Sequence, residues 1–128
     1  MTKVLLIEDE RLLAEVQRDA LTNSGYEVVI TNNALDAIEA VDIFKPDFIV
    51  ADVLLAGATI FALLHELQSY GDTKNIPVIL CTNIADQFNQ VSLKKYGVYN
   101  IIDKSTMLPD DIRAAIKACE IQLKEGER

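Results

Sequence analysis

The chain has 128 residues, of which half are apolar and a quarter are charged, and its formal net charge is −8. This length suits a single domain spanning residues 1–128, and the composition is that of a folded protein rather than a disordered one. The negative charge would repel a phosphate backbone, which argues against direct nucleic-acid binding, and no apolar run approaches the ~20 residues needed to cross a bilayer.

Apolar, β-branched runs alternate with segments of helical spacing along the chain. The runs begin near Val4, Val28, Phe48, Val78 and Tyr99. This alternation predicts an α/β fold in which a doubly wound, five-stranded parallel sheet is covered by helices on both faces. Because the crossovers between parallel strands are right-handed, the loops that follow the strands should gather along one edge of the sheet.

The intervening segments predict five helices. They are expected over residues 10–24, from after Asn33 to Lys45, from about Ile60 to Leu67, over residues 85–96, and over residues 109–123. Helical spacing predicts that the inward positions include Val16 in the first helix and Leu35 in the second, with Val91 available for packing in the fourth.

Two features indicate the compartment. Cys81 and Cys119 lack a CxxC spacing and lie in apolar settings, so we expect reduced thiols. The opening residues Met1-Thr2-Lys3 lead into a strand that is too short and too soon acidic for a signal peptide. A cytoplasmic protein whose partners are proteins or cations is therefore expected.

Polar residues of complementary chemistry follow four of the predicted strands. Glu8 and Asp9 end the first run, Asp52 ends the third, Thr82 ends the fourth and Lys104 follows the fifth. In doubly wound folds the carboxyl ends of the strands form the crevice that binds ligands. The sequence therefore predicts that these side chains meet in one site.

Three carboxylates in one site require a counter-charge. Like charges ~4 Å apart repel by about 4 kcal/mol at an effective dielectric constant of 20. A hard divalent ion would relieve this repulsion, and Mg²⁺ fits best because it accepts carboxylate and carbonyl oxygens and shares phosphate oxygens. Glu8, Asp9 and Asp52 are the predicted ligands, with the backbone carbonyl of Leu54 as a further one.

The remaining groups suit phosphoryl transfer. An oxygen of Asp52 could attack phosphorus as a covalent nucleophile and form an aspartyl phosphate. Lys104 would supply a second positive charge, and the Thr82 hydroxyl could donate a hydrogen bond to the phosphoryl group.

Three other protein classes fit the sequence less well. A flavodoxin would need hydroxyls and amides in its first loop, where this chain has Glu8, Asp9 and Glu10. A dinucleotide-binding Rossmann domain would need a GxGxxG turn, which is absent. A phosphatase of the haloacid-dehalogenase type would need a second acid two residues after its nucleophile, where this chain has Leu54.

Four segments resemble the receiver domain of two-component response regulators. Residues 3–10 resemble its opening strand and acidic pair, and residues 47–52 its phosphoacceptor strand. Residues 76–82 are similar to the strand with the switch hydroxyl, and residues 97–104 to the strand with the lysine. The spacings agree as well, since 30 residues separate Asp52 from Thr82 and 22 separate Thr82 from Lys104.

The resemblance implies a flavodoxin-like sheet with the strand order 2-1-3-4-5. It implies that Asp52 accepts a phosphoryl group from the phosphohistidine of a sensor histidine kinase or a phosphotransfer protein. It also implies that Glu8, Asp9, Asp52 and the Leu54 carbonyl hold Mg²⁺. Such a domain is a signalling module, not an enzyme beyond self-phosphorylation from small phosphodonors and slow autodephosphorylation.

The resemblance further implies that Thr82 and Lys104 report phosphorylation to a distant surface. Phosphorylation would shift an inactive-to-active equilibrium, mainly on the face formed by the fourth helix, fifth strand and fifth helix. A downstream protein target, or a second copy of the chain in a homodimer, would bind there.

The chain departs from the family at several positions. Ala56 stands where a proline is usual and Ile60 where a glycine is usual, which predicts a reshaped loop after the phosphoacceptor. Ser105 replaces a proline that usually follows a cis bond; a cis bond before a non-proline residue costs ~3 to 4 kcal/mol, so this bond either stores strain or is trans. Ile101 replaces the usual aromatic switch residue, and Tyr99, two residues earlier on the same predicted strand face, is a candidate substitute.

Two hypotheses follow from these departures. The altered loop and the missing aromatic leave open an alternative function, a receiver-like interaction module that works without phosphorylation. If the site is phosphorylated, Leu54 and Ile84 flank the route of the attacking water two positions beyond Asp52 and Thr82. Apolar groups there cannot orient water, which predicts a long-lived phosphorylated state.

Overall fold

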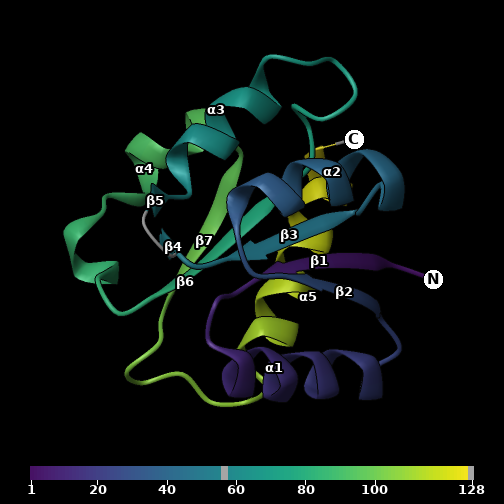
Figure 1. Ribbon diagram of the computed structural model, residues 1–128, viewed down its shortest axis with the longest axis vertical. Helices are drawn as coiled ribbons and strands as arrows, with labels where there is room; N and C mark the ends of the chain where they lie inside the picture. Colours follow the sequence, from purple (N-terminus) through teal and green to yellow (C-terminus); the bar gives the residue numbers. More distant parts are fainter. Residues whose placement is uncertain (56–57, 127–128) are drawn as a thin grey trace.

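A five-stranded parallel sheet forms the centre of the protein (Figure 1). The computed structural model describes residues 1–55 and 58–126. The sheet contains β1 (Lys3–Ile7), β2 (Glu27–Thr31), β3 (Phe48–Ala51), β6 (Val78–Thr82) and β7 (Val98–Asp103). The strands lie in the order β2-β1-β3-β6-β7, and every neighbouring pair is parallel. This order confirms the predicted doubly wound fold with its 2-1-3-4-5 arrangement of five principal strands.

Helices cover both faces of the sheet (Figure 1). They are α1 (Arg11–Asn23), α2 (Ala34–Phe44), α3 (Phe61–Gln68), α4 (Gln90–Leu93) and α5 (Asp111–Gly126), with short 3₁₀ helices η1 (Ala85–Gln87) and η2 (Lys94–Tyr96). The core residues of α1 and α5 pack on one face, and those of α2, α3 and α4 pack on the other. None of the described helices is long and apolar enough to cross a membrane.

Successive side chains of the central strands enter the two cores alternately. In β1, Leu5 and Ile7 join the core beneath α2 and α3, whereas Val4 and Leu6 join the core beneath α1 and α5. All four are at most 1% exposed, and full burial of each such side chain contributes about 1.5–3 kcal/mol to folding. Because β1 is buried on both faces, its sequence is continuously apolar from Val4 to Ile7 and becomes polar at Glu8.

Both cysteines are free, buried thiols in the core beneath α1 and α5. Burial raises the pKa of Cys81 to about 12 and that of Cys119 to about 11. The thiolate is the reactive form of cysteine, so both side chains behave as small core residues.

The predicted inward faces of the first two helices are partly wrong. In α1 the buried residues are Ala14, Gln17 and Leu21, and Val16 is 53% exposed. The apolar pattern did not predict this face because Gln17, one of its buried residues, is polar. Leu35 in α2 is likewise exposed, because it lies about 200° around the helix from the buried Ala37.

The fourth predicted helix is broken rather than continuous. Phe88 is extended, with φ −119° and ψ 142°, and so separates η1 from α4. The Asn89 side chain then caps α4 by accepting a hydrogen bond from the Val91 amide at 2.9 Å. In this short helix Val91 is exposed and Leu93 is buried, so Val91 makes no core contact.

The fifth helix starts two residues later than predicted. The Asp111 amide donates to the Leu108 carbonyl at 3.0 Å, which closes a turn with Pro109 at its second position. Proline favours this position because its fixed φ suits the turn. Pro109 therefore precedes α5 instead of opening it.

A β-bulge in β7 overturns the expected position of Tyr99. Val98 pairs with Val78 and Asn100 pairs with Ile79, so β7 contains one extra residue at this point. As a result Tyr99 packs against the core beneath α1 and α5, while Ile101 packs against the opposite core. Tyr99 and Ile101 do not share a strand face, and the proposed substitution of one for the other is wrong.

The loop after β3 forms a small hairpin that was not predicted as such. β4 (Leu54–Leu55) pairs antiparallel with β5 (Ala58–Thr59). Ile60 then anchors the start of α3, because its side chain is fully buried and its amide donates to the Val53 carbonyl at 2.8 Å. Ala56, the other departure in this loop, lies outside the described residues.

Candidate functional site

The ends of neighbouring strands place the predicted polar residues side by side. Ile7 pairs with Ala51 in the sheet, so the residues that follow them, Glu8 and Asp52, leave adjacent strands at the same level. The Asp52 amide donates to the Ile7 carbonyl at 3.2 Å, which extends the ladder one residue beyond β3. The Lys104 amide donates to the Thr82 carbonyl at 3.1 Å at the end of β7.

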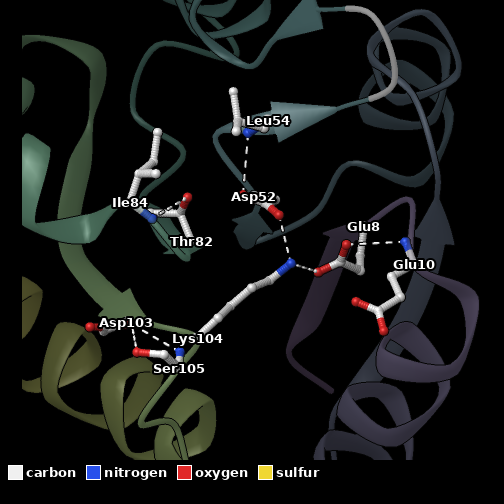
Figure 2. Close-up of polar contacts among 9 residues, drawn as sticks. All are labelled: Glu8, Glu10, Asp52, Leu54, Thr82, Ile84, Asp103, Lys104 and Ser105. Atoms are coloured by element: carbon white, nitrogen blue, oxygen red, sulfur yellow. Dashed lines mark hydrogen bonds and ion pairs between the residues drawn. The ribbon is translucent and has the colours of Figure 1, made fainter.

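Lys104 joins the two buried carboxylates (Figure 2). Its Nζ lies 2.5 Å from Glu8 Oε1 and 2.6 Å from Asp52 Oδ2. The Lys104 side chain is 8% exposed, that of Glu8 2% and that of Asp52 11%. The ammonium is thus held between two acids in a nearly dry site, where electrostatic interactions are stronger than in water.

Burial and charge pairing oppose one another at this site. Burial raises the pKa of Glu8, and the hydrogen bond from Lys104 offsets this only in part, so the pKa remains above its usual range. Burial by itself would lower the pKa of Lys104, but hydrogen bonds to Asp52 and Glu8 outweigh it and raise that pKa. Lys104 therefore stays positively charged at neutral pH.

Backbone amides orient the other oxygen of each buried carboxylate. Glu8 Oε2 accepts a hydrogen bond from the Glu10 amide, and Asp52 Oδ1 accepts one from the Leu54 amide, both at 3.2 Å. Each acid therefore binds the amide two residues further along the chain (Figure 2). These two amides are the contributors that the sequence analysis missed, because no side-chain pattern encodes a backbone donor.

The three predicted acidic ligands lie close enough to share a cation. Glu8, Asp9 and Asp52 each offer a carboxylate oxygen, and these oxygens lie within 4.8 Å of one another. Asp9 is exposed, whereas Glu8 and Asp52 are buried, so the cluster opens towards solvent at Asp9. Leu54, whose carbonyl is the fourth predicted ligand, lies two residues after Asp52, and its amide is hydrogen-bonded to the Asp52 carboxylate.

Thr82 lies beside Asp52, on the side opposite Glu8 (Figure 2). Its side chain is buried, and its Oγ1 accepts a hydrogen bond from the Ile84 amide at 3.4 Å. Within residues 1–55 and 58–126, no hydrogen bond joins the Thr82 side chain to Asp52 or Lys104. The hydroxyl is thus near the phosphoacceptor candidate but not part of the Lys104 network.

The loop after Lys104 is held by its own hydrogen bonds. Asp103 Oδ1 accepts from the Ser105 amide at 2.9 Å and from Ser105 Oγ at 2.6 Å. These bonds, from the hydroxyl first and then the amide, lower the pKa of Asp103. The described residues contain no cis peptide bond, so the bond before Ser105 is trans, which decides between the two alternatives left by the sequence.

Comparison with known proteins identifies the family. The family model of the response regulator receiver domain matches residues 4–117 of this chain. The chain belongs to this family. The polar-differentiation response regulator DivK of Brucella anthropi is 28% identical over 106 residues, which cover 83% of this chain and 86% of DivK.

Solved receiver structures share the fold. A CheY-like receiver domain protein of Methanospirillum hungatei superposes with a TM-score of 0.84 at 21% identity, covering 100% of this chain and 99% of that one. The receiver domain of a sensor histidine kinase from Pseudomonas aeruginosa has a TM-score of 0.79 at 19% identity, covering 91% and 95%. That structure has a magnesium ion coordinated in its active-site cleft.

Membership places this receiver domain in two-component signalling. Receiver domains interact with histidine kinases and with downstream targets, and they are signalling domains rather than true enzymes. The sheet end with Glu8, Asp52 and Lys104 is therefore the place to seek its signalling chemistry.

Proposed function

We propose that this receiver domain takes a phosphoryl group onto Asp52 from the phosphohistidine of a sensor histidine kinase or a phosphotransfer protein. The observation that carries the proposal is the contact of Lys104, which follows β7, with both Asp52, which follows β3, and Glu8, which follows β1. This contact places a cation directly against the Asp52 carboxylate, where it could stabilise the charge of a transferring phosphoryl group. The single-domain boundary, residues 1–128, and a cytoplasmic location remain predictions.

Asp52 is the proposed nucleophile. An Asp52 oxygen would form a bond to phosphorus while the bond between phosphorus and the histidine nitrogen breaks, and the imidazole leaves with that electron pair. The Leu54 amide supports this role, because it holds Asp52 Oδ1 and fixes the orientation of the carboxylate. The product is an aspartyl phosphate.

Lys104 is the proposed charge partner of the incoming group. Its Nζ already lies at hydrogen-bond distance from Asp52 Oδ2, so a small side-chain movement would bring it to a phosphoryl oxygen. A cation placed in advance stabilises the charge of the transferring group without reorganisation of solvent. The Thr82 hydroxyl would donate a hydrogen bond to another phosphoryl oxygen from the opposite side.

The acidic cluster fits Mg²⁺. When Glu8, Asp9, Asp52 and Lys104 are all ionised, three carboxylates and one ammonium leave a formal charge of −2, which one divalent cation neutralises. All the available ligands are oxygens, as Mg²⁺ prefers. We assign the three carboxylates and the Leu54 carbonyl as the groups that would hold it. Bound Mg²⁺ would offset the charge of the carboxylates and of the incoming phosphoryl group.

The proposed output is a change at a protein-interaction surface. Phosphorylation would alter the positions of Thr82 and Lys104, which end β6 and start the loop after β7. The face formed by α4, β7 and α5 adjoins these strand ends, and we propose it as the surface for a downstream target or a homodimer. Ile101 is packed against the core on the α4 side of β7, so any switching there proceeds without an aromatic at this position.

Phosphorylation from acetyl phosphate with Mg²⁺ tests the proposal. Intact mass should show one added phosphoryl group on the wild type and none on Asp52→Asn, which keeps the shape of the side chain. Asp19→Asn on the exposed surface of α1 is the matched control and should be labelled like the wild type. Unlabelled wild type, with the folded state checked by circular dichroism, would instead favour the phosphorylation-independent interaction module.

A further inference from the structure

A cavity of about 540 Å³ lies between the C-terminal ends of α2 and α3. Its apolar lining includes Ile38 and Val41 of α2, Leu67 of α3, and Tyr70 and Ile76 of the following loop. The volume falls in the range of sites that bind small molecules or the side chains of a peptide. Tyr70 is 56% exposed, so its ring is accessible to a ligand in the cavity.

The cavity is remote from the phosphoryl-transfer site. Pro46, which lines it, comes two residues before β3, whereas Asp52 comes directly after β3. The strand between them spans about 13 Å at ~3.3 Å per residue. A ligand in the cavity would therefore leave Asp52 free, and its binding does not depend on the proposed function.

Carboxylates surround the opening of the cavity on two sides. Glu39 and Asp42 project from α2, and Glu66 and Asp72 belong to α3 and the loop after it. All four are exposed, and none has an ion-pair or hydrogen-bond partner for its side chain within the described parts of the chain. Among the described lining residues only Lys45 is basic.

The helix ends add to this negative potential. The last turn of α2 contains no basic residue, although Lys45 follows it as the C-cap, and α3, with His65 in its last turn, also directs its C-terminal end towards the cavity. The C-terminal end of a helix carries a partial negative charge, which favours a cation nearby. The opening thus combines two helix ends, four unpaired acids and one lysine around an apolar floor, so acids outnumber bases by three.

The walls are already shaped for a ligand. Thr73 Oγ1 donates to the Leu67 carbonyl at 2.6 Å, and the Lys74 amide donates to the Tyr70 carbonyl at 3.0 Å. Gln68 Nε2 also donates to the Lys74 carbonyl at 3.1 Å. These bonds tie the loop to the end of α3, so a ligand would not need to order it and would avoid that entropic cost.

We propose that this cavity binds a basic peptide segment of a partner protein, with an apolar anchor side chain inserted and Lys or Arg residues on both sides. The apolar residues at the floor of the cavity would pack against the anchor side chain of the peptide. Because the acids lie on two opposite sides, positive charges before and after the anchor can both be paired, which a small molecule with a single positive charge cannot do. Charge complementarity therefore selects a cationic chain that crosses the opening.

A fluorescent peptide tests the proposal. The protein contains no tryptophan, so the tryptophan of an acetylated, amidated peptide KKLWKK can be followed without background from the protein. We expect saturable binding below about 1 mM at low salt, weaker binding at about 0.3 M salt, and none with the peptide EELWEE. Amide chemical shifts in the protein should move for Ile38 and Ile76.

Variants locate the binding. Glu39→Gln combined with Glu66→Gln removes one acid from each side and should weaken KKLWKK about fivefold. Tyr70→Ser should weaken it without any change of charge. A control pair, Asp19→Asn in α1 with Asp86→Asn in η1, changes the net charge equally at exposed positions that do not line the cavity and should stay within about twofold of the wild type.

Three results would overturn the proposal. They are absence of KKLWKK binding, equal weakening by the two double variants, and equal binding of EELWEE. Each would show that the cavity does not select a cationic chain. Labelling of Asp52 by acetyl phosphate should be unchanged in every variant, which checks folding and separates this proposal from the proposed function.

Discussion

Replacing Lys104 with methionine should destabilise the protein because it leaves two buried acids without their shared cation. Methionine is similar in length and apolar, so the substitution removes the charge with little change of volume. Glu8 and Asp52 would then face each other with only the Glu10 and Leu54 amides to stabilise them. Their mutual repulsion would no longer be offset.

The structure sets the size of the effect. Removing one partner of a buried ion pair costs about 3–5 kcal/mol. The Asp52 side chain is 11% exposed and the cluster opens to solvent at Asp9, so we expect the lower end, about 3 kcal/mol. With a urea dependence of about 1.5–2 kcal/mol per M, the unfolding midpoint should fall by about 1.5–2 M.

The stability lost in Lys104→Met should also depend on pH. The raised pKa of Glu8 means that the folded state binds more protons there than the unfolded state, so ionisation of Glu8 reduces stability as the pH rises above its ordinary value of 4.5. Removing Lys104 takes away interactions that lower this pKa and so enlarges the effect. Lys104 itself stays charged up to its ordinary value of 10.5 and beyond, because its pKa is raised.

Urea unfolding measured between about pH 5 and pH 8, with a chelator present, tests both the size of the destabilisation and its dependence on pH. The cost of Lys104→Met should be smallest near pH 5 and largest near pH 8. Lys74→Met is the matched control, because Lys74 is exposed and its ammonium forms no ion pair in the described structure; it should change stability by less than about 0.5 kcal/mol. A Lys104→Met variant as stable as this control would refute the reasoning.

Three further predictions concern the site and the backbone. Leu54→Asn should speed dephosphorylation up to about tenfold, because one hydrogen bond to the attacking water is worth up to ~1.4 kcal/mol; a phosphate-release rate no faster than wild type contradicts this. Mg²⁺ at about 100 times its Kd should stabilise the wild type by about 2.7 kcal/mol in thermal melts, and Asp9→Asn should lose most of that gain. Gly97→Ala should cost about 2 kcal/mol in urea unfolding, because the φ of Gly97 is +80° and a Cβ would lie 3.3 Å from the Ile76 carbonyl oxygen. Gly25→Ala should cost only about 1 kcal/mol, because the φ of Gly25 is +94° but a Cβ there would meet open space.

The strands and their end residues could be predicted because strands buried on both faces have continuously apolar sequences. Val4 to Ile7 and Phe48 to Ala51 are apolar on both faces, and each run stops at an acid. Parallel pairing then fixes where those acids lie. The position of Lys104 followed from the same rule, but its contact with Glu8 as well as Asp52 depends on how far the side chain reaches from β7 towards β1, which spacing does not specify.

The helix faces and the β7 register were harder to predict. Gln17 is buried in α1 although it is polar, so the apolar residues alone pointed to a face displaced by one position. The bulge at Tyr99 reverses the alternation of side chains, and no glycine or proline marks it in the sequence. The break in the fourth helix depends on the extended Phe88, whose ring packs 5.6 Å from that of Phe61, a contact between distant segments.

The bulge in β7 also makes the two open sides of the sheet unequal. β2 presents an evenly spaced row of main-chain donors and acceptors, since its pairing with β1 is regular from Glu27 to Thr31. β7 presents an interrupted row, because the extra residue at Tyr99 breaks the spacing. Of these two edges of the five-stranded sheet, β2 therefore offers an added strand from another polypeptide the evenly spaced template. Self-association through β7 would therefore have to use side-chain packing instead of a continued sheet.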